Sequence, residues 1–296
     1  MPDLIYIIGS GRSGSTVVER ILNSADEVVA VGEVHALWRL PVETLRCSCG
    51  KLVPDCPFWC EALRAAGIGP DQLAELAELE HRVIRNSHLV KLRFDPARIV
   101  QDPDIARFLA LQKHLFDGIR QASGARVVVD SSKAGPRARV LQAGLEPVFL
   151  HTYREAEAVM ASWRSRKHDP GTNALMKRPP LSEAAIDWIK AEHTARALSR
   201  RTTVVRVDHT AFSHAPRRTL SAALDPHMPG LVDAVAWTSE NSVRPAEAYH
   251  SVLGNPDRFN SGDIVIEPRG SRRDRPSARE RFLIRSVGRV LNRLYP

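Results

Sequence analysis

The stretch that decides the fold is Leu4-Ile-Tyr-Ile-Ile-Gly-Ser-Gly-Arg-Ser-Gly-Ser-Thr16. Its first five residues are a continuous apolar run, which is typical of a buried strand in a parallel sheet. A glycine-rich turn follows, and the apolar residues after it share one helix face: Val17, Val18, Ile21 and Leu22. A second strand is expected at residues 27–31. Strand, glycine loop, helix and strand in this order begin a phosphate-binding α/β unit.

The rest of the chain repeats the alternation of strands and helices. Apolar runs predict further strands at residues 126–130, 148–153 and 203–207, and helical spacing predicts helices at 71–85, 102–121, 155–166 and 182–200. For 296 residues this favours one α/β domain spanning residues 1–296.

Three segments depart from this alternation. Residues 41–70 hold all four cysteines among glycine and proline, which indicates an inserted loop region. Residues 167–181 carry three prolines and little periodicity, so we expect an exposed loop able to gate a site. Residues 276–296 form a basic amphipathic pattern, which predicts a C-terminal helix.

The charge balance favours an anionic partner. The chain has 42 Lys+Arg against 34 Asp+Glu, a net charge of +8, which suits nucleic acid, a phosphorylated cofactor or a membrane surface. No apolar run approaches the ~20 residues of a membrane span. The start of the chain leads straight into a strand without a signal-peptide pattern, and four cysteines are too few for a disulfide scaffold. We therefore expect a cytoplasmic protein.

The glycine loop has three interpretations, of which the first is a nucleotide triphosphate site. Gly9, Gly14 and Thr16 fit G-x-x-x-x-G-K-[ST], but Ser15 stands at the lysine position. That lysine reaches the β- and γ-phosphates, so its absence argues against an ordinary ATPase or GTPase. The run Val127-Val-Val-Asp130 imitates the strand that ends in a magnesium-binding aspartate, and supports this interpretation only weakly.

The second interpretation is a dinucleotide site. Gly9-x-Gly11-x-x-Gly14 lies between a strand and a helix, and Glu33 stands near the ~20-residue offset of a ribose-binding acid. This leaves an NAD(P)- or FAD-dependent oxidoreductase as an alternative.

The third interpretation is a phosphate cradle in which Arg12 and the hydroxyls of Ser13, Ser15 and Thr16 replace the lysine. Backbone N–H groups at a helix start bind anions, and the planar guanidinium suits phosphate or sulfate. Such an anion need not be hydrolysed and needs no magnesium. We expect an anion site at this loop.

A second motif lies downstream. The strand Phe149-Leu-His-Thr-Tyr153 ends at Arg154, and Ser162 follows eight residues later, so both can converge on one phosphate. With the loop at residues 12–16, this pair resembles the PAPS-dependent sulfotransferases, closest to the bacterial and tyrosylprotein branches (PAPS is 3'-phosphoadenosine-5'-phosphosulfate). In that family the loop holds the 5'-phosphosulfate and the Arg/Ser pair holds the 3'-phosphate.

The resemblance implies a P-loop NTPase-like parallel sheet flanked by helices, a PAPS cosubstrate that leaves as adenosine 3',5'-bisphosphate, and a hydroxyl acceptor. No catalytic metal is expected. Glycan, glycolipid, phenol and peptide tyrosine all remain open as acceptors.

The resemblance also implies site residues. It assigns cofactor binding to Gly11, Arg12, Ser13, Gly14, Ser15, Thr16, Arg154 and Ser162, and, in a C-terminal segment at 250–261, to Arg258 and Ser261. Glu33 matches the catalytic glutamate, with His35 as the weaker candidate base. Arg12 and Lys133 match residues at the leaving group and sulfuryl oxygens. Gly14-Ser15-Thr16 departs from the more usual Gly-Thr-Thr, and residues 205–212 replace a Tyr-Glu-Asp-like segment.

The cysteines have two equally supported interpretations. Cys47, Cys49, Cys56 and Cys60 are closely spaced and suit a structural zinc ion, or they are reduced packing thiols.

The C-terminal helix also has two interpretations. Its apolar residues (Leu283, Val287, Val290, Leu291 and Leu294) lie opposite Arg281, Arg285, Arg289 and Arg293. Packing of the leucines on the domain is favoured over contact with anionic lipid. Nucleic acid is not an expected partner, because no helix-turn-helix or ribonucleoprotein motif occurs. A basic lipid- or nucleic-acid-binding protein is the non-enzymatic alternative.

Overall fold

A five-stranded parallel sheet forms the centre of the computed structural model, which describes residues 2–164, 168–169, 174–175, 178–268 and 278–294. The strand order is β2-β3-β1-β4-β7. The strands are β1 (Leu4–Ile8), β2 (Val28–Gly32), β3 (Val127–Asp130), β4 (Val148–Tyr153) and β7 (Val204–Asp208). All five strands expected from the sequence are confirmed within one residue at each end, and so is the predicted α/β fold class.

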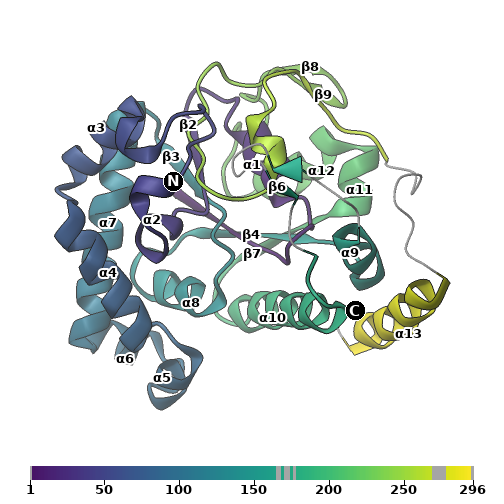
Figure 1. Ribbon diagram of the computed structural model, residues 1–296, viewed down its shortest axis with the longest axis horizontal. Helices are drawn as coiled ribbons and strands as arrows, with labels where there is room; N and C mark the ends of the chain where they lie inside the picture. The colour runs from purple at the N-terminus through teal and green to yellow at the C-terminus, as the bar shows by residue number, and fades with distance from the viewer. Residues whose placement is uncertain (1, 165–167, 170–173, 176–177, 269–277, 295–296) are drawn as a thin grey trace.

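Helices cover both faces of the sheet (Figure 1). Leu4, Tyr6 and Ile8 of β1 face a core shared with α7 (Pro103–Ser123) and α8 (Gly135–Gly144). Ile5 and Ile7 face the opposite core, shared with α1 (Ser15–Leu22) and α12 (Pro216–Leu224). Burial on both faces explains why the strand is apolar at every position.

Every described helix of more than ten residues was predictable, whereas most of the shorter ones were not. The expected helices at 71–85, 102–121, 155–166 and 182–200 correspond to α4 (Pro70–Val83), α7, α9 (Ala156–Trp163) and α10 (Leu181–Ser199). Sequence analysis missed α8, α12 and the shorter helices α2 (Ala36–Arg39), α5 (Asn86–Lys91), α6 (Pro96–Gln101) and α11 (His209–His214). Fewer than three helical turns give few apolar repeats, so the helical period is seldom visible in the sequence.

Small sheets lie outside the main one. An antiparallel sheet joins β8 (Trp237–Ser239), β9 (Ser242–Val243) and β10 (Ile264–Val265), and the turn η3 (Pro256–Phe259) lies between β9 and β10. A hairpin of β5 (His168–Asp169) and β6 (Ala174–Leu175) falls within the gating loop predicted at 167–181. Much of that loop lies outside the described residues, so its gating role stays a prediction.

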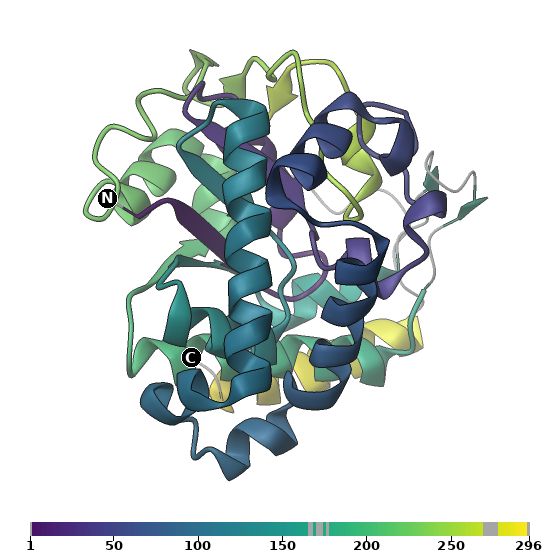
Figure 2. The ribbon, with the colours of Figure 1, turned by 90° about the vertical axis from the view of Figure 1, so that its left-hand side faces the viewer.

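The insertion at residues 41–70 is not a loop throughout, so this expectation was wrong. The insertion begins with the short turns η1 (Val42–Thr44) and η2 (Val53–Asp55). Helix α3 (Pro57–Ala66) follows them and buries Trp59 and Ala62. The helix packs closely on α7, because a Cβ on Gly118 would fall 2.3 Å from the Ala62 carbonyl oxygen (Figure 2). The preceding cluster of glycine, proline and cysteine hid the helix, although Pro57 suits its first position.

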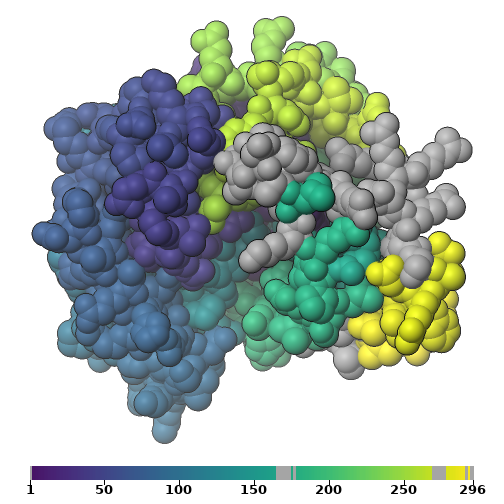
Figure 3. All heavy atoms as spheres, viewed as in Figure 1, coloured from purple at the N-terminus to yellow at the C-terminus, as the bar shows by residue number. Residues whose placement is uncertain are grey.

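The C-terminal helix exists as α13 (Ala278–Leu294), but the expected packing of its apolar face was wrong. Ile284 is buried, and a Cβ on Gly288 would lie 3.1 Å from Glu157 of α9. Other apolar residues of the helix are exposed: Phe282 by 71%, Leu283 by 45%, Val287 by 41% and Val290 by 56%. Helix α13 lies at the rim of the molecule (Figure 3). Because Gly288 has no side chain, α13 approaches α9 closely on this side of the helix, and Ile284 is buried there. The side chains of Leu291 and Leu294 lie outside the described part.

Within the described ranges, no helix combines the length and apolarity needed to cross a membrane. The cytoplasmic location stays a prediction.

Candidate active site

Four segments that are far apart in the chain meet at one edge of the sheet. The loop Gly9–Gly14 follows β1, Glu33 follows β2, Lys133 follows β3 after two serines, and Arg154 follows β4. Because the strands are parallel and adjacent, their carboxyl ends share one edge, with about 4.8 Å between neighbours. In open α/β sheets this is the edge at which ligands bind.

The glycine loop is clamped to β4. The Ser13 hydroxyl donates to the Ser10 carbonyl at 2.8 Å and lies 2.8 Å from the Thr152 hydroxyl. A Cβ on Gly9 would fall 2.4 Å from Thr152 Oγ1 and 2.9 Å from its carbonyl oxygen, so only glycine fits there. Gly14, with φ of 97°, turns the loop into α1.

The loop ends at a helix start that is suited to an anion. Ser15 and Thr16 form the buried first turn of α1, which has no acidic residue and no side-chain cap. Backbone N–H groups in a first turn lack partners within the helix, and they carry the positive end of its dipole. The Gly11 N–H, one residue before Arg12, donates to Asp187 Oδ2 at 2.8 Å.

Asp187 lies in α10 and was missed by sequence analysis, since nothing in the helical pattern distinguishes it. Desolvation raises the pKa of its carboxyl group, and the Gly11 N–H opposes this. A carboxylate thus already contacts an N–H group of the loop.

Two arginines from separate motifs also meet here. Arg154 Nη1 donates to the Arg12 carbonyl at 3.0 Å, across 142 residues of sequence. The Arg12 guanidinium stacks over Trp163 at 4.7 Å, and a Cβ on Gly11 would strike this ring at 2.4 Å. Burial lowers the pKa of Arg12, although Asp257 opposes the shift. Ser162 lies beside Trp163 in the last turn of α9.

Lys133 and Glu33 form an ion pair at the ends of neighbouring strands. Lys133 Nζ donates to Glu33 Oε1 at 2.8 Å and to the Ser131 carbonyl at 2.9 Å. Burial disfavours the charged lysine, but the carboxylates of Glu33, Glu19 and Asp187 together outweigh it, so the pKa of Lys133 is raised. Lys133 and Arg12 both have left-handed backbone, with φ of 59° and 70°. Such strain in residues without glycine's freedom clusters at functional sites.

A buried network holds the loop that carries Lys133. Arg137 Nη1 donates to Asp130 Oδ2 at 2.6 Å, and both side chains are fully buried. Asp130 Oδ1 accepts from the Ser132 backbone N–H at 2.9 Å, while Tyr6 exchanges hydrogen bonds with the backbone of Ala134. The Asp130 carboxylate is therefore already paired with Arg137. This disfavours the triphosphate interpretation, in which the same aspartate would bind magnesium.

His35 is a poor proton acceptor. It is 7% exposed, and burial, reinforced by Arg39, Arg137 and Lys133, lowers its pKa to about 2. Its Nε2 lies 4.0 Å from Glu33 Oε2. Of the two residues considered for proton abstraction, Glu33 is therefore the better suited.

The C-terminal segment reaches the same edge. The Asn255 N–H donates to Thr16 Oγ1 at 3.3 Å, and the Val252 carbonyl accepts from the Glu33 N–H at 2.8 Å. Arg258 lies in η3, is 6% exposed, and donates to the Arg46 carbonyl at 3.4 Å. Ser261 lies just beyond η3 and is exposed. The structure thus brings the segment onto α1 but leaves Ser261 at its surface.

The strand order disfavours the dinucleotide interpretation. In the dinucleotide-binding order 3-2-1-4-5-6, the second strand lies beside the first. Here β3 lies between β1 and β2, so Glu33 follows a strand about 10 Å from β1. Glu33 is therefore not in the position of the ribose-binding acid.

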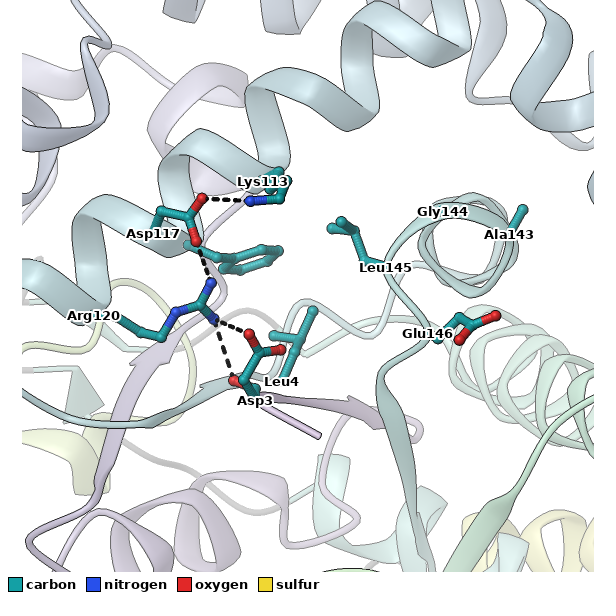
Figure 4. A pocket seen from close by; sticks show the side chains of 10 residues that line it. Asp3, Leu4, Lys113, Asp117, Arg120, Ala143, Gly144, Leu145 and Glu146 are labelled. Carbon is teal, nitrogen blue, oxygen red and sulfur yellow. Dashed lines mark hydrogen bonds and ion pairs between the residues drawn. The ribbon is translucent and has the colours of Figure 1, made fainter. Parts of the chain in front are cut away.

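A pocket at the other end of β1 has no comparable features. Asp3 and Leu4 line it together with α7 and the end of α8 (Figure 4). Four of its charged groups pair with one another, since Arg120 contacts Asp3 and Asp117, and Lys113 lies 2.9 Å from Asp117. We assign no site to this pocket.

Solved structures are similar to this chain, whereas no family model and no curated protein matches it. The sulfotransferase domain of the Synechococcus PCC 7002 olefin synthase is similar in structure at 16% identity and a TM-score of 0.45, covering 98% of this chain and 95% of that one. Sulfotransferase STF9 from Mycobacterium avium is similar at 13% identity and a TM-score of 0.43, covering 79% of this chain and 67% of that one.

Proposed function

We propose that this protein is a sulfotransferase that moves the sulfuryl group of PAPS to a hydroxyl acceptor. One observation carries the proposal: the glycine loop with Arg12, Glu33, Lys133 and Arg154 follow four adjacent parallel strands and lie at one edge. Each of these positions corresponds to a motif residue of the family that the sequence resembles.

The nucleotide is bound from two sides. The N–H groups and hydroxyls of Gly11, Arg12, Ser13, Gly14, Ser15 and Thr16 hold the 5'-phosphosulfate at the start of α1. Arg154 and Ser162 hold the 3'-phosphate, with Arg258 and Ser261 on the C-terminal side. The hydrogen bond of Arg154 Nη1 to the Arg12 carbonyl at 3.0 Å supports a single nucleotide site, because it brings the two motifs together.

PAPS supplies the sulfuryl group and a phosphate leaving group. Glu33 accepts the proton of the acceptor hydroxyl while the new O–S bond forms and the S–O bond to phosphate breaks. Arg12 and Lys133 neutralise the negative charge that develops on the leaving oxygen. Positioning and charge stabilisation by side chains supply most of the rate, as in phosphoryl transfer, and the proposal needs no catalytic metal.

The Lys133–Glu33 ion pair supports these roles. At 2.8 Å the lysine holds the Glu33 carboxylate at the edge of the sheet where the glycine loop lies. Lys133 lies between Glu33 and the glycine loop in the strand order, since β3 separates β2 from β1.

Transfer from radiolabelled PAPS tests the proposal. The purified protein is incubated with glycan, glycolipid, phenol and tyrosine-peptide acceptors, and label is followed into each. Label that reaches one acceptor class with wild-type protein but not with Glu33→Gln supports the proposal. Release of adenosine 3',5'-bisphosphate without labelled product in any class argues against it.

We further propose that α13 contacts an anionic lipid surface. Its exposed apolar residues Leu283, Val287 and Val290 share one face of a helix that has five arginines between residues 279 and 293. An apolar face flanked by basic side chains suits the boundary between headgroups and acyl chains.

A further inference from the structure

Three cysteines of the insertion lie beside a histidine almost two hundred residues later. The ligand atoms of Cys47, Cys49, Cys56 and His250 all lie within 4.8 Å of one another. Cys60, grouped with these cysteines by sequence, lies apart: it is exposed and donates to the Pro54 carbonyl at 3.0 Å. We propose that Cys47, Cys49, Cys56 and His250 bind a structural zinc ion.

The spacing of the four atoms fits a tetrahedral zinc site. Bonds of about 2.3 Å to sulfur and 2.0–2.1 Å to nitrogen place two sulfurs about 3.8 Å apart, and a sulfur and a nitrogen about 3.6 Å apart. Cys56 Sγ lies 3.7 Å from Cys49 Sγ and 3.8 Å from Cys47 Sγ. His250 Nδ1 lies 3.5 Å from Cys47 Sγ and 3.4 Å from Cys56 Sγ. Four edges of the tetrahedron thus have the required length.

The same distances exclude a disulfide in this arrangement. Two bonded sulfurs lie about 2.05 Å apart, and all four cysteines of the chain are free. Three thiols and an imidazole have few other reasons to gather so closely, whereas Cys₃His is an established structural zinc set.

Backbone and ring contacts hold the ligands in place. The Gly50 N–H donates to the Cys47 carbonyl, and the Cys47 N–H donates to the Lys51 carbonyl, each at 2.9 Å. This turn, with φ of 89° at Gly50, brings Cys47 and Cys49 to the same side. The His250 imidazole stacks on Phe58 at 4.6 Å with 8° between the ring planes, which fixes its orientation. A second contact that orients a metal-binding histidine is typical of zinc sites.

The zinc would fasten the insertion to the C-terminal segment near the candidate active site. Ser48 donates its N–H to the Ser251 carbonyl at 3.0 Å and its hydroxyl to the Tyr249 carbonyl at 2.5 Å, on either side of His250. Two residues after His250, the Val252 carbonyl accepts the Glu33 N–H at 2.8 Å, and the Val252 N–H donates to the Val31 carbonyl at 3.0 Å. Loss of the ion would therefore loosen the segment that holds the backbone of Glu33. This consequence rests on the proposed function, but the metal site itself does not.

Metal analysis and cobalt substitution of the full chain test the proposal. We expect one zinc per chain in protein purified without chelator, and the visible bands of tetrahedral cobalt–thiolate after exchange into Co²⁺. A thiol-specific mercurial should release the zinc from wild-type protein. Cys56→Ser and His250→Ala should each lower the zinc content about tenfold or more. Cys60→Ser is the matched control and should retain it.

Several results would overturn the proposal. These are wild-type protein that neither contains zinc nor gives the cobalt spectrum, a disulfide among Cys47, Cys49 and Cys56 found by mass spectrometry, or zinc loss in Cys60→Ser equal to that in Cys56→Ser. The wild-type measurements decide even where a variant does not fold. None depends on nucleotide binding, so failure of the proposed enzymatic function leaves this result readable.

Discussion

Lys133 Nζ lies 2.8 Å from Glu33 Oε1, although the two residues are one hundred positions apart in the chain. The pair forms because β2 and β3 are neighbours and each residue follows its strand directly or within a short turn. Neither side chain is fully exposed, with 16% exposure for Lys133 and 21% for Glu33. The relationship places a carboxylate and a cation beside the glycine loop, and this is the basis of the proposed chemistry.

Replacing Glu33 by glutamine should lower the rate of sulfuryl transfer by about 10²–10⁴-fold, the usual contribution of a general base. The amide keeps the size of the side chain but cannot accept the proton. Binding of adenosine 3',5'-bisphosphate should change little, which separates catalysis from cofactor affinity. The measurement is kcat with the acceptor found in the labelled-PAPS screen. Full turnover by Glu33→Gln would show that Glu33 is not the base, and it would say nothing against the fold.

Replacing Arg154 by alanine should weaken binding of adenosine 3',5'-bisphosphate by about ten- to hundredfold, since hydrogen bonds to charged groups contribute ~1.5–3 kcal/mol. Adenosine 5'-phosphate, which lacks the 3'-phosphate, should lose far less. Arg206→Ala is the control, because Arg206 lies on the neighbouring strand β7 and stacks on Tyr153 at 3.7 Å. Calorimetry on both variants with both nucleotides gives the comparison. An equal loss for the two nucleotides would show that Arg154 does not recognise the 3'-phosphate.

His35 should make the protein sensitive to acid. Above pH 6.5 the imidazole is neutral in the folded and unfolded states, so it adds no pH dependence there. Between pH 6.5 and about 2 the unfolded chain binds a proton that the folded chain excludes, so stability falls as pH falls. The slope is about 1.4 kcal/mol per pH unit well inside this window.

Urea denaturation of wild type and His35→Gln at pH 7, 5.5 and 4.5 isolates this contribution, because the other groups cancel in the difference. The variant should lose less stability than wild type on acidification. An exposed histidine, His214, provides the control variant His214→Gln. Parallel stability curves for wild type and His35→Gln would contradict the burial of a neutral imidazole.

Helix α13 should bind anionic vesicles. Replacing Leu283 and Val287 together by serine should weaken this binding by more than tenfold, because each buried apolar side chain contributes ~1.5–3 kcal/mol. Added salt should weaken it further by screening the arginines. Sedimentation with vesicles of phosphatidylserine and phosphatidylcholine, against phosphatidylcholine alone, measures both effects. Equal partitioning of wild type and the double variant would show that the apolar face does not contribute to vesicle binding.

The sequence reveals the parts of this fold that depend on local pattern. Strand β1 is a continuous apolar run, and β3 and β4 each begin with three apolar residues, because helices cover both faces of the sheet. The glycine loop marks its own turn. The sequence could not show which strands are neighbours in the sheet. The Lys133–Glu33 contact and the separation of β2 from β1 follow from the strand order, which only long-range packing decides.

The less predictable parts of the site depend on distant contacts. His250 joins cysteines about two hundred positions earlier, and no spacing rule relates them, whereas Cys60 fits the local spacing and lies elsewhere. Asp187 reaches the Gly11 N–H from a helix whose periodicity reveals only its apolar face. Ile284 rather than Leu283 packs on the domain because Gly288, one turn on, allows close approach to α9.

The most direct test of the central claim is calorimetric titration of the purified protein with adenosine 3',5'-bisphosphate, with NADH, FAD and ATP as controls. We expect the bisphosphate alone among these four to bind, and to bind about ten- to hundredfold more weakly to Arg154→Ala. Selective binding of NADH or FAD would contradict the proposed function and show that the glycine loop binds a dinucleotide.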